Sequence, residues 1–233
     1  MSARHPVIAM IHAVSAGASV AGSAFAREFP EARPWNLLDD RLLDDARAEG
    51  GLTRALHRRM LRLIAHAVRG GADGLLLTCS SYGEVVDTAR TLWDVPMLKA
   101  DEAMFKTALA GPHDRLAVVA STPPAVPAAV AQLTALAPRV RPDRPVEIVT
   151  ALSERAATAE SPEETARHLA DALRSNGAGA APVVLLAQYS LAPAGPPLAA
   201  SLGVPVLDGA GAAARELRGR LLGGVPEPAG AAS

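Results

Sequence analysis

The sequence predicts an α/β protein made of two similar lobes, each built around a parallel sheet. Two observations predict this fold: short apolar runs alternate with longer helical patterns, and the second half of the chain repeats the first. A chain of 233 residues with 49% hydrophobic residues is long enough for two lobes of roughly 110 residues, each with its own core.

Eight short apolar runs predict the strands. Each run is nearly continuous in hydrophobic residues, which is typical of a parallel strand that is buried on both faces. The runs are residues 6–13, 34–38, 74–79, 95–98, 115–120, 145–149, 182–187 and 204–207. Helical patterns lie between them at residues 52–69, 82–91, 102–110 and 162–175. This alternation of strand and helix predicts parallel sheets with right-handed crossovers.

An internal repeat relates the two halves of the chain. GLLLTCSS at residues 74–81 aligns with VVLLAQYS at residues 183–190, an offset of 109. VPMLKADEA at residues 95–103 aligns with VPVLDGAGA at residues 204–212 at the same offset, and the first strands align at an offset of 108. A nearly constant offset over three elements indicates two lobes with the same order of elements.

The repeat also predicts the domain boundaries and the position of the site. We expect one lobe at residues 1–110, a second at residues 111–222 and a frayed tail at residues 223–233. Ligands of open parallel sheets bind beyond the C-terminal ends of the strands. If the two lobes face each other, these strand ends surround one shared cleft, and we expect the active site there.

Composition excludes several classes of function. The net charge is -1 and aromatic residues make up 3%, so nothing indicates a nucleic-acid surface. A single cysteine rules out a disulfide within the chain and is typical of a reducing compartment. No signal peptide and no apolar stretch of about 18 residues is visible, so we expect a soluble, cytoplasmic protein without a membrane partner. The six histidines lack metal-ligand spacing, so no metal site is expected.

Cys79 is the strongest catalytic candidate, and the repeat places it opposite Gln188 in the alignment. Each of these residues follows an apolar strand and precedes a helical pattern. Ser81 and Glu84 have the spacing of a capping box, which predicts a helix that begins at Ser81. A helix N-terminus close to Cys79 would favour the thiolate, which is the reactive form. The alternative is that Cys79 is a small buried hydrophobic residue.

Polar side chains gather at the predicted C-terminal ends of the strands. These residues are His12, Ser15, Asn36, Ser80, Ser81, Ser121, Thr122, Tyr189 and Ser190. Hydroxyl, amide and backbone N–H donors around one cleft are suited to binding a carboxylate. Taken singly, each is more typical of a helix cap or a turn.

Five segments, in this order, resemble the aspartate/glutamate racemase superfamily, which also holds hydantoin racemases, maleate isomerases and arylmalonate decarboxylases. The segments are WNLLDDRLL at 35–43, GADGLLLTCSSYGEVVD at 71–87, VPMLKADEAM at 95–104, LAVVASTPP at 116–124 and VVLLAQYSLA at 183–192. The resemblance implies two pseudo-symmetric lobes and a small carboxylate substrate. It also implies two cysteines that move a proton on opposite faces of the substrate, without metal or pyridoxal phosphate. Members often form dimers or higher assemblies, so the resemblance leaves a homo-oligomer open.

The resemblance implies roles for individual residues, and the sequence departs from the family pattern at one of them. Cys79 matches the first family cysteine, and Ser80, Ser81 and Thr122 match positions that bind the carboxylate. Gln188 stands where the second cysteine belongs, and a glutamine amide cannot act as a general acid or base near neutral pH.

Three interpretations follow from this departure. The first is a racemase or epimerase in which Tyr189, His12 or a water replaces the second thiol. The second is a one-thiol decarboxylase that resembles the arylmalonate decarboxylases, although those enzymes keep the cysteine of the second lobe. The third is a carboxylate-binding protein without turnover. Another acid or base opposite Cys79 would favour the first, an apolar pocket the second, and a buried, inert Cys79 the third.

Overall fold

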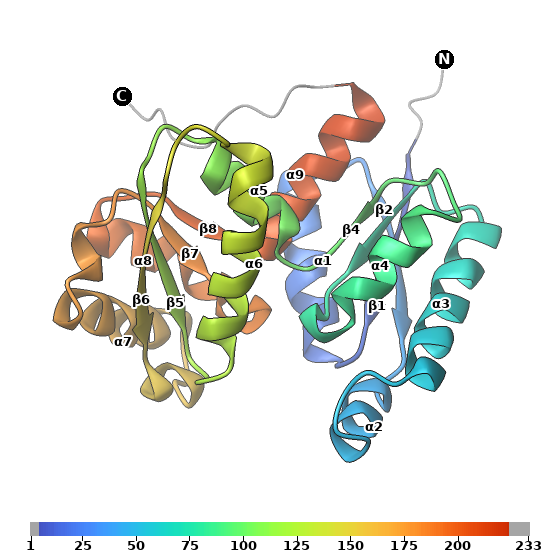
Figure 1. The fold of residues 1–233 in the computed structure, drawn as a ribbon, viewed down its shortest axis with the longest axis horizontal. Helices are drawn as coiled ribbons and strands as arrows, with labels where there is room; N and C mark the ends of the chain where they lie inside the picture. The colour runs from blue at the N-terminus through green and yellow to red at the C-terminus, as the bar shows by residue number, and fades with distance from the viewer. Residues whose placement is uncertain (1–4, 224–233) are drawn as a thin grey trace. The chain divides into compact units, whose positions relative to one another are not determined.

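The computed structural model describes residues 5–223, and its internal contacts divide the chain into two compact units. The first unit contains residues 5–102 and 213–223, and the second contains residues 103–212. Each unit is an α/β layer structure with one four-stranded sheet (Figure 1). The two units are described separately below.

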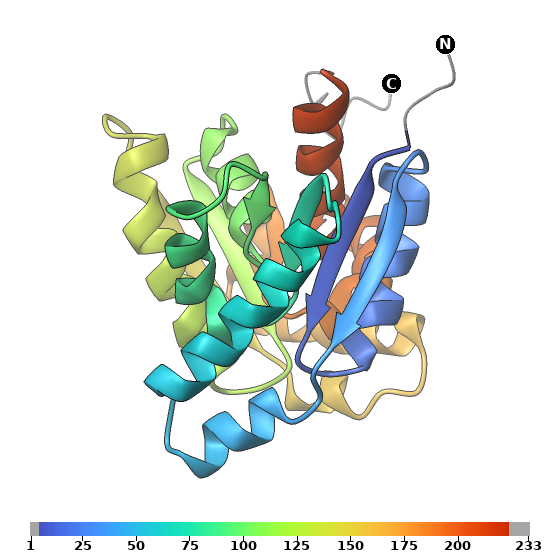
Figure 2. The same cartoon turned by 90° about the vertical axis from the view of Figure 1, so that its right-hand side faces the viewer.

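The sheet of the first unit has the strand order β2-β1-β3-β4, and all of its pairs are parallel. Its strands are β1 (Val7–His12), β2 (Arg33–Leu38), β3 (Gly74–Leu77) and β4 (Met97–Leu98). Figure 2 shows β1 and β2 running side by side in the same direction. The two central strands, β1 and β3, are almost entirely buried, as expected of parallel strands covered on both faces.

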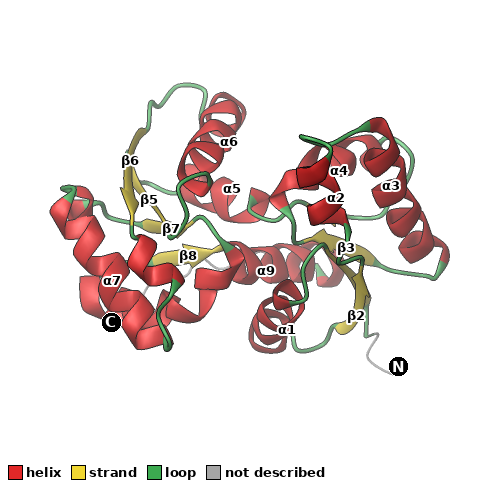
Figure 3. Cartoon of the chain, turned by 90° about the horizontal axis from the view of Figure 1, so that it is seen from below, coloured by secondary structure: helices red, strands yellow, loops and turns green. Residues whose placement is uncertain are grey.

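Helices cover both faces of this sheet. They are α1 (Ala16–Glu28), α2 (Leu42–Ala48), α3 (Arg54–Arg69) and α4 (Gly83–Arg90), with a 3-10 turn η1 (Ser80–Tyr82) before α4. Side chains of α3 and α4 form one core cluster with Ala9, Ile11, Leu75 and Leu77 of the central strands. Figure 3 shows α1 and α9 on the opposite side of the sheet.

The second unit repeats this arrangement with the strand order β6-β5-β7-β8, again all parallel. The strands are β5 (Arg115–Ala120), β6 (Glu147–Leu152), β7 (Val184–Leu186) and β8 (Val206–Asp208). The helices are α6 (Ala125–Val140), α7 (Pro162–Ser175) and α8 (Gly195–Leu202), with 3-10 turns η2 (Glu154–Ala157), η3 (Ala178–Ala180) and η4 (Tyr189–Ala194). Side chains of α7 and α8 pack against the central strands β5 and β7.

The register of the strands confirms the internal repeat. Leu75 pairs with Met97 in the first sheet, and Val184 pairs with Val206 in the second, which is the same pairing at the predicted offset. The β1–β2 and β5–β6 pairs are likewise in equivalent register. Two lobes of the same topology were therefore predicted correctly.

The last helix of each repeat crosses the boundary between the units. These helices are α5 (Glu102–Ala110) and α9 (Gly209–Leu222). From residue 103 onward α5 groups with the second unit, and from residue 213 onward α9 groups with the first. The division at residues 1–110 and 111–222 assigns each of these helices to its own repeat, so the observed grouping differs there. Most of the predicted tail, residues 224–233, lies outside the described residues.

All eight predicted strands and all four predicted helices are present, but burial on both faces was wrong for two strands. The strands β2 and β6 lie at the edge of their sheets, and about half of their residues are exposed. Their apolar runs are short and interrupted by polar residues, as an edge position allows.

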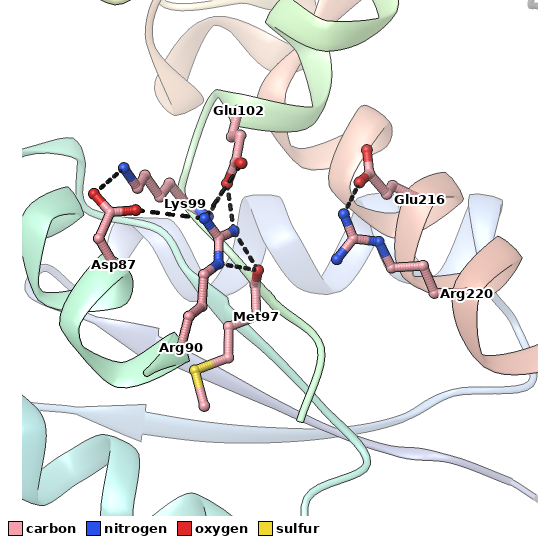
Figure 4. A network of polar contacts seen from close by, with 7 residues as sticks. All are labelled: Asp87, Arg90, Met97, Lys99, Glu102, Glu216 and Arg220. Carbon is pink, nitrogen blue, oxygen red and sulfur yellow. Dashed lines mark hydrogen bonds and ion pairs between the residues drawn. The ribbon is translucent and has the colours of Figure 1, made fainter. Parts of the chain in front are cut away.

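A polar network holds β4 and the start of α5 in place (Figure 4). The Arg90 guanidinium donates to the Met97 carbonyl oxygen from Nε at 3.2 Å and Nη2 at 2.5 Å, and to the Glu102 carboxylate from Nη2 at 2.6 Å. Asp87 accepts from Lys99 Nζ at 2.6 Å on the same surface. These contacts fix the segment through which the chain leaves the first unit.

Candidate functional site

Cys79 lies just beyond the C-terminal end of β3, a central strand of the first unit. Its side chain is half-buried and packs against the edge of the core cluster. Ser80 and Ser81 follow it, exposed, in η1. The predicted capping box at Ser81 was wrong, because η1 comes first and α4 begins only at Gly83.

Tyr82 anchors the turn that carries Cys79. Its side chain is wholly buried, and its hydroxyl donates a hydrogen bond of 2.6 Å to the Leu42 carbonyl oxygen at the start of α2. Burial raises the pKa of Tyr82, and its electrostatic interaction with Cys79 raises it further. The phenol therefore remains a protonated donor near neutral pH. Sequence reasoning missed this residue, although it stands inside the segment around Cys79.

His12 joins the ends of three neighbouring strands in the first unit. It is wholly buried at the end of β1, with Nδ1 2.9 Å from Thr78 Oγ1 and Nε2 3.0 Å from Asn36 Oδ1. Asn36 is an exposed residue of β2, and Thr78 directly precedes Cys79. Helix α1 approaches this group so closely that a Cβ atom at Gly17 would lie 3.1 Å from Thr78 Oγ1 and 3.3 Å from His12 Nδ1.

The surroundings of His12 favour a neutral ring. Burial lowers the pKa of His12, and the hydrogen bond with Asn36 offsets only part of that effect. Nε2 contacts the Asn36 side-chain oxygen and Nδ1 contacts Thr78 Oγ1, whose hydroxyl also donates to the Ile11 carbonyl oxygen at 3.2 Å. His12 therefore holds Asn36 and Thr78 in place, with no ring nitrogen left for another partner.

An ion-pair cluster lies after β2 in the same unit. Arg59 of α3 binds both carboxylate oxygens of Asp39, at 2.6 Å from Nε and 2.5 Å from Nη2. Its Nη1 donates to Asp45 Oδ2 of α2 at 2.7 Å. Such a two-pronged contact fixes geometry as well as charge. The charges of this cluster also act on the pKa of Tyr82: Arg59 lowers it, whereas Asp39 and Asp45 raise it.

Gln188 lies beyond β7 in the second unit, at the position that the repeat pairs with Cys79. Its Oε1 accepts three hydrogen bonds from the loop after β5: Ser121 N at 2.6 Å, Ser121 Oγ at 3.1 Å and Thr122 N at 3.2 Å. Two backbone N–H donors require an oxygen at that position, so the orientation of the amide is determined. The donors of Ser121 and Thr122 therefore hold Gln188 itself.

Ser15, Tyr189 and Ser190 are the remaining predicted site residues. Ser15 precedes α1, is exposed, and its side chain does not cap the helix. Tyr189 is half-buried at the start of η4, and Ser190 is exposed beside it. The structure thus brings together two groups, His12 with Asn36 in the first unit and Gln188 with Ser121 and Thr122 in the second.

Exposed apolar side chains accompany the polar ones at these strand ends. Val14 follows β1, and Leu38 ends β2. Leu152 ends β6 in the second unit, at the register position equivalent to that of Leu38. In the first unit, Arg41 and Lys99, which follow β2 and β4, are both ion-paired.

Residues 5–223 contain neither a membrane-spanning helix nor a cluster of metal-ligand side chains. Within this part of the chain, no helix is long and apolar enough to cross a membrane. Within the same part, no group of three or more His, Cys, Asp or Glu residues is arranged to hold a metal ion.

Solved structures of known proteins share the fold of this chain. Glutamate racemase RacE1 from Bacillus anthracis is 12% identical, with a TM-score of 0.68 over 95% of this chain and 83% of that chain. Allantoin racemase from Klebsiella pneumoniae is 19% identical, with a TM-score of 0.66 over 95% and 90%. Unliganded arylmalonate decarboxylase is 19% identical, with a TM-score of 0.64 over 94% of each chain.

These structural likenesses establish the fold, and the sequence establishes the family. No curated protein sequence matches the chain. The profile of the family described as Asp/Glu/Hydantoin racemase matches residues 24–217, which is most of the chain. The resemblance inferred from the sequence is thereby confirmed, and the chain belongs to the Asp/Glu/hydantoin racemase family.

Proposed function

We propose that this protein is a cofactor-independent racemase or epimerase that uses Cys79 to transfer the proton at a carbon next to a carboxylate. The observation that carries the proposal is the placement of Cys79. In a member of this family, the only cysteine lies half-buried at the C-terminal end of a central parallel strand, where ligands of such sheets bind. A half-buried cysteine also differs from an inert core cysteine, which is fully buried.

The chemistry requires a weak carbon acid to ionise. The Cys79 thiolate takes the α proton and becomes a thiol, and the electron pair of the C–H bond spreads into the carboxylate as an enediolate. Hydrogen-bond donors stabilise that charge as it forms. Ser80 and Ser81 suit this role, because they follow Cys79 directly and their side chains are exposed. Inversion is complete when an acid on the opposite face protonates the same carbon.

The second proton donor must be a group other than Gln188 and other than His12. A carboxamide does not exchange protons near neutral pH. His12 is wholly buried with both ring nitrogens engaged, which suits a positioning residue for Thr78 next to Cys79. Tyr189 or a water molecule remains as the acid on the second face.

A one-thiol decarboxylase is the second candidate, and the exposed Val14 and Leu38 favour it. An apolar substituent on the substrate would contact such side chains, as an aryl- or alkylmalonate requires. Loss of carbon dioxide from one carboxylate would leave the electron pair on the α carbon. The Cys79 thiol would then protonate that carbon from one face, and no second acid would be needed.

Hydrogen exchange in heavy water tests the proposal. Purified protein is incubated in D₂O with amino acids, hydantoins and aryl- or alkylmalonates, and proton NMR follows the α position. We expect Cys79-dependent deuterium incorporation with loss of optical purity. Since general acid–base groups contribute about 10²- to 10⁴-fold, Cys79→Ser should slow the exchange by at least about 100-fold.

Two controls sharpen this test. Because Cys79 is the only cysteine, iodoacetamide labels one position and should abolish exchange in the native protein. Circular dichroism of Cys79→Ser should match that of the native protein, which excludes unfolding. Undiminished exchange in Cys79→Ser contradicts the proton-transfer role. Deuterated product from a malonate, without inversion of any amino acid, replaces the racemase by the decarboxylase.

A further inference from the structure

Gln188 has a free donor whose direction the structure determines. Three donors converge on its Oε1, so its Nε2 is turned away from the loop after β5. No hydrogen-bond partner of Nε2 is found among residues 5–223, and the side chain is half-buried. A carboxamide that is held by its oxygen and open at its nitrogen is a rigid, neutral hydrogen-bond donor.

All three hydrogen bonds to Gln188 Oε1 come from a single loop, the one after β5. The donors are two successive backbone N–H groups and one hydroxyl, from Ser121 and Thr122. Such a set of donors is itself suited to a carboxylate oxygen, and here the side chain of Gln188 occupies it. The loop therefore binds Gln188 rather than a substrate, and the donor presented to solvent is Nε2.

We propose that Gln188 Nε2 binds a carboxylate oxygen of the substrate, and thus that the residue at the second thiol position is a substrate-binding donor. This inference rests on the proposed function, since it assigns a role within the same reaction. A neutral donor stabilises negative charge on the carboxylate in the ground state and on the enediolate when the α proton has left.

The acidic residue at the end of the neighbouring strand is held at a helix terminus. Asp208 ends β8, the strand next to β7, and its Oδ1 accepts from Gly211 N at 2.7 Å at the start of α9. This carboxylate is therefore engaged with a helix terminus, where negative charge is stabilised. Ser190, exposed on η4, adds a hydroxyl donor two residues from Gln188.

The test follows the side-chain amides directly by NMR. The chain contains only two glutamines and two asparagines, so a ¹⁵N–¹H spectrum holds four carboxamide pairs, from Asn36, Gln132, Asn176 and Gln188. The spectrum of Gln188→Glu identifies the pair that belongs to Gln188. During titration with malonate, we expect the Gln188 pair to shift with saturation while the Gln132 pair stays unchanged.

Three variants distinguish the loss of malonate binding from the loss of the hydrogen bonds to the loop after β5 and from the effect of an added negative charge. Gln188→Glu keeps an acceptor for Ser121 and Thr122 but removes the donor, so the fold should persist while malonate binding weakens by about 10- to 100-fold. Gln188→Met removes the donor without adding charge, so it should weaken binding by at least about 10-fold and also lower the melting temperature. Gln132→Glu makes the same charge change on α6 and should leave the affinity for malonate unchanged.

The outcomes distinguish this inference from the proposed function. If malonate shifts the backbone amides of Ser80 and Ser81 but not the Gln188 pair, the inference is overturned and the role of Cys79 stands. Native affinity in Gln188→Met also overturns it, because the weakening in Gln188→Glu would then be charge repulsion alone. A shift of the Gln188 carboxamide pair, together with undiminished deuterium exchange in Cys79→Ser, supports the inference and contradicts the proposed proton transfer by Cys79.

Discussion

His12 shows how one buried residue can organise the end of a sheet. It contacts Asn36 of β2 and Thr78 after β3, so a single ring spans three strands. Its neutral state follows from burial, which opposes the charged form more strongly than the Asn36 hydrogen bond supports it. Protonation of this ring would place a charge beside Thr78, directly before Cys79.

This arrangement predicts a pH dependence of stability. The pKa of His12 in the folded state lies below its ordinary value of 6.5, so above that pH both the folded and unfolded states are neutral at this position. As the pH falls below 6.5 the unfolded state binds the proton first, and the free energy of unfolding decreases. His12→Gln should therefore lose less stability between pH 7.5 and 5 than the native protein. Urea unfolding at both pH values measures this, and equal losses would contradict it.

At the scale of elements, the Arg90 network ties α4, β4 and the start of α5 together (Figure 4). Arg90 satisfies the carbonyl oxygen of Met97 in a strand of only two residues, and it neutralises the largely buried Glu102 carboxylate. So short a strand gains little stability from its own backbone hydrogen bonds to β3. The guanidinium thus supplies much of what holds β4 in position.

Removing this guanidinium should be costly. Arg90→Met leaves the Met97 carbonyl and the Glu102 carboxylate without it, and we expect a loss of about 1–3 kcal/mol in the free energy of unfolding. Arg47→Met is a matched control, because Arg47 pairs with Asp44 on the surface, where both side chains are well exposed. That change should stay within about 0.5 kcal/mol. Denaturant melts of both variants measure the difference, and equal effects would mean that the network adds no stability.

At the scale of the whole molecule, the sequence predicts the topology of the sheets better than it predicts individual side-chain contacts. The repeat found both sheets and paired Cys79 with Gln188, because buried parallel strands leave a clear apolar pattern. The hold of Ser121 and Thr122 on Gln188 could not be predicted, since it depends on which way one side chain turns. The burial of His12 was hidden for a similar reason, as it depends on how closely α1 approaches at Gly17.

The sequence also could not predict with which unit each of the helices α5 and α9 groups. Alanine-rich helices show that a face is buried but not which sheet covers it. In the structure, a Cβ atom at Gly74 of β3 would lie 3.3 Å from Leu217 Cδ2 and 3.3 Å from Leu221 Cδ1, so α9 packs directly on the first sheet. A helix encoded at the end of the second repeat thus covers the strand that leads to Cys79.

This exchange predicts where a core mutation in α9 will act. Leu217 is wholly buried, and Leu217→Ala should cost about 2–5 kcal/mol because it leaves a cavity. Hydrogen exchange measured by mass spectrometry should then show faster exchange in β1 and β3, with β5 and β7 much less affected. Leu198→Ala in α8 is the matched control, because Leu198 is buried in the core cluster of β5 and β7 and should give the reverse pattern. If Leu217→Ala instead loosened β5 and β7 as much as β1 and β3, the contribution of α9 to the first unit would not be a local one.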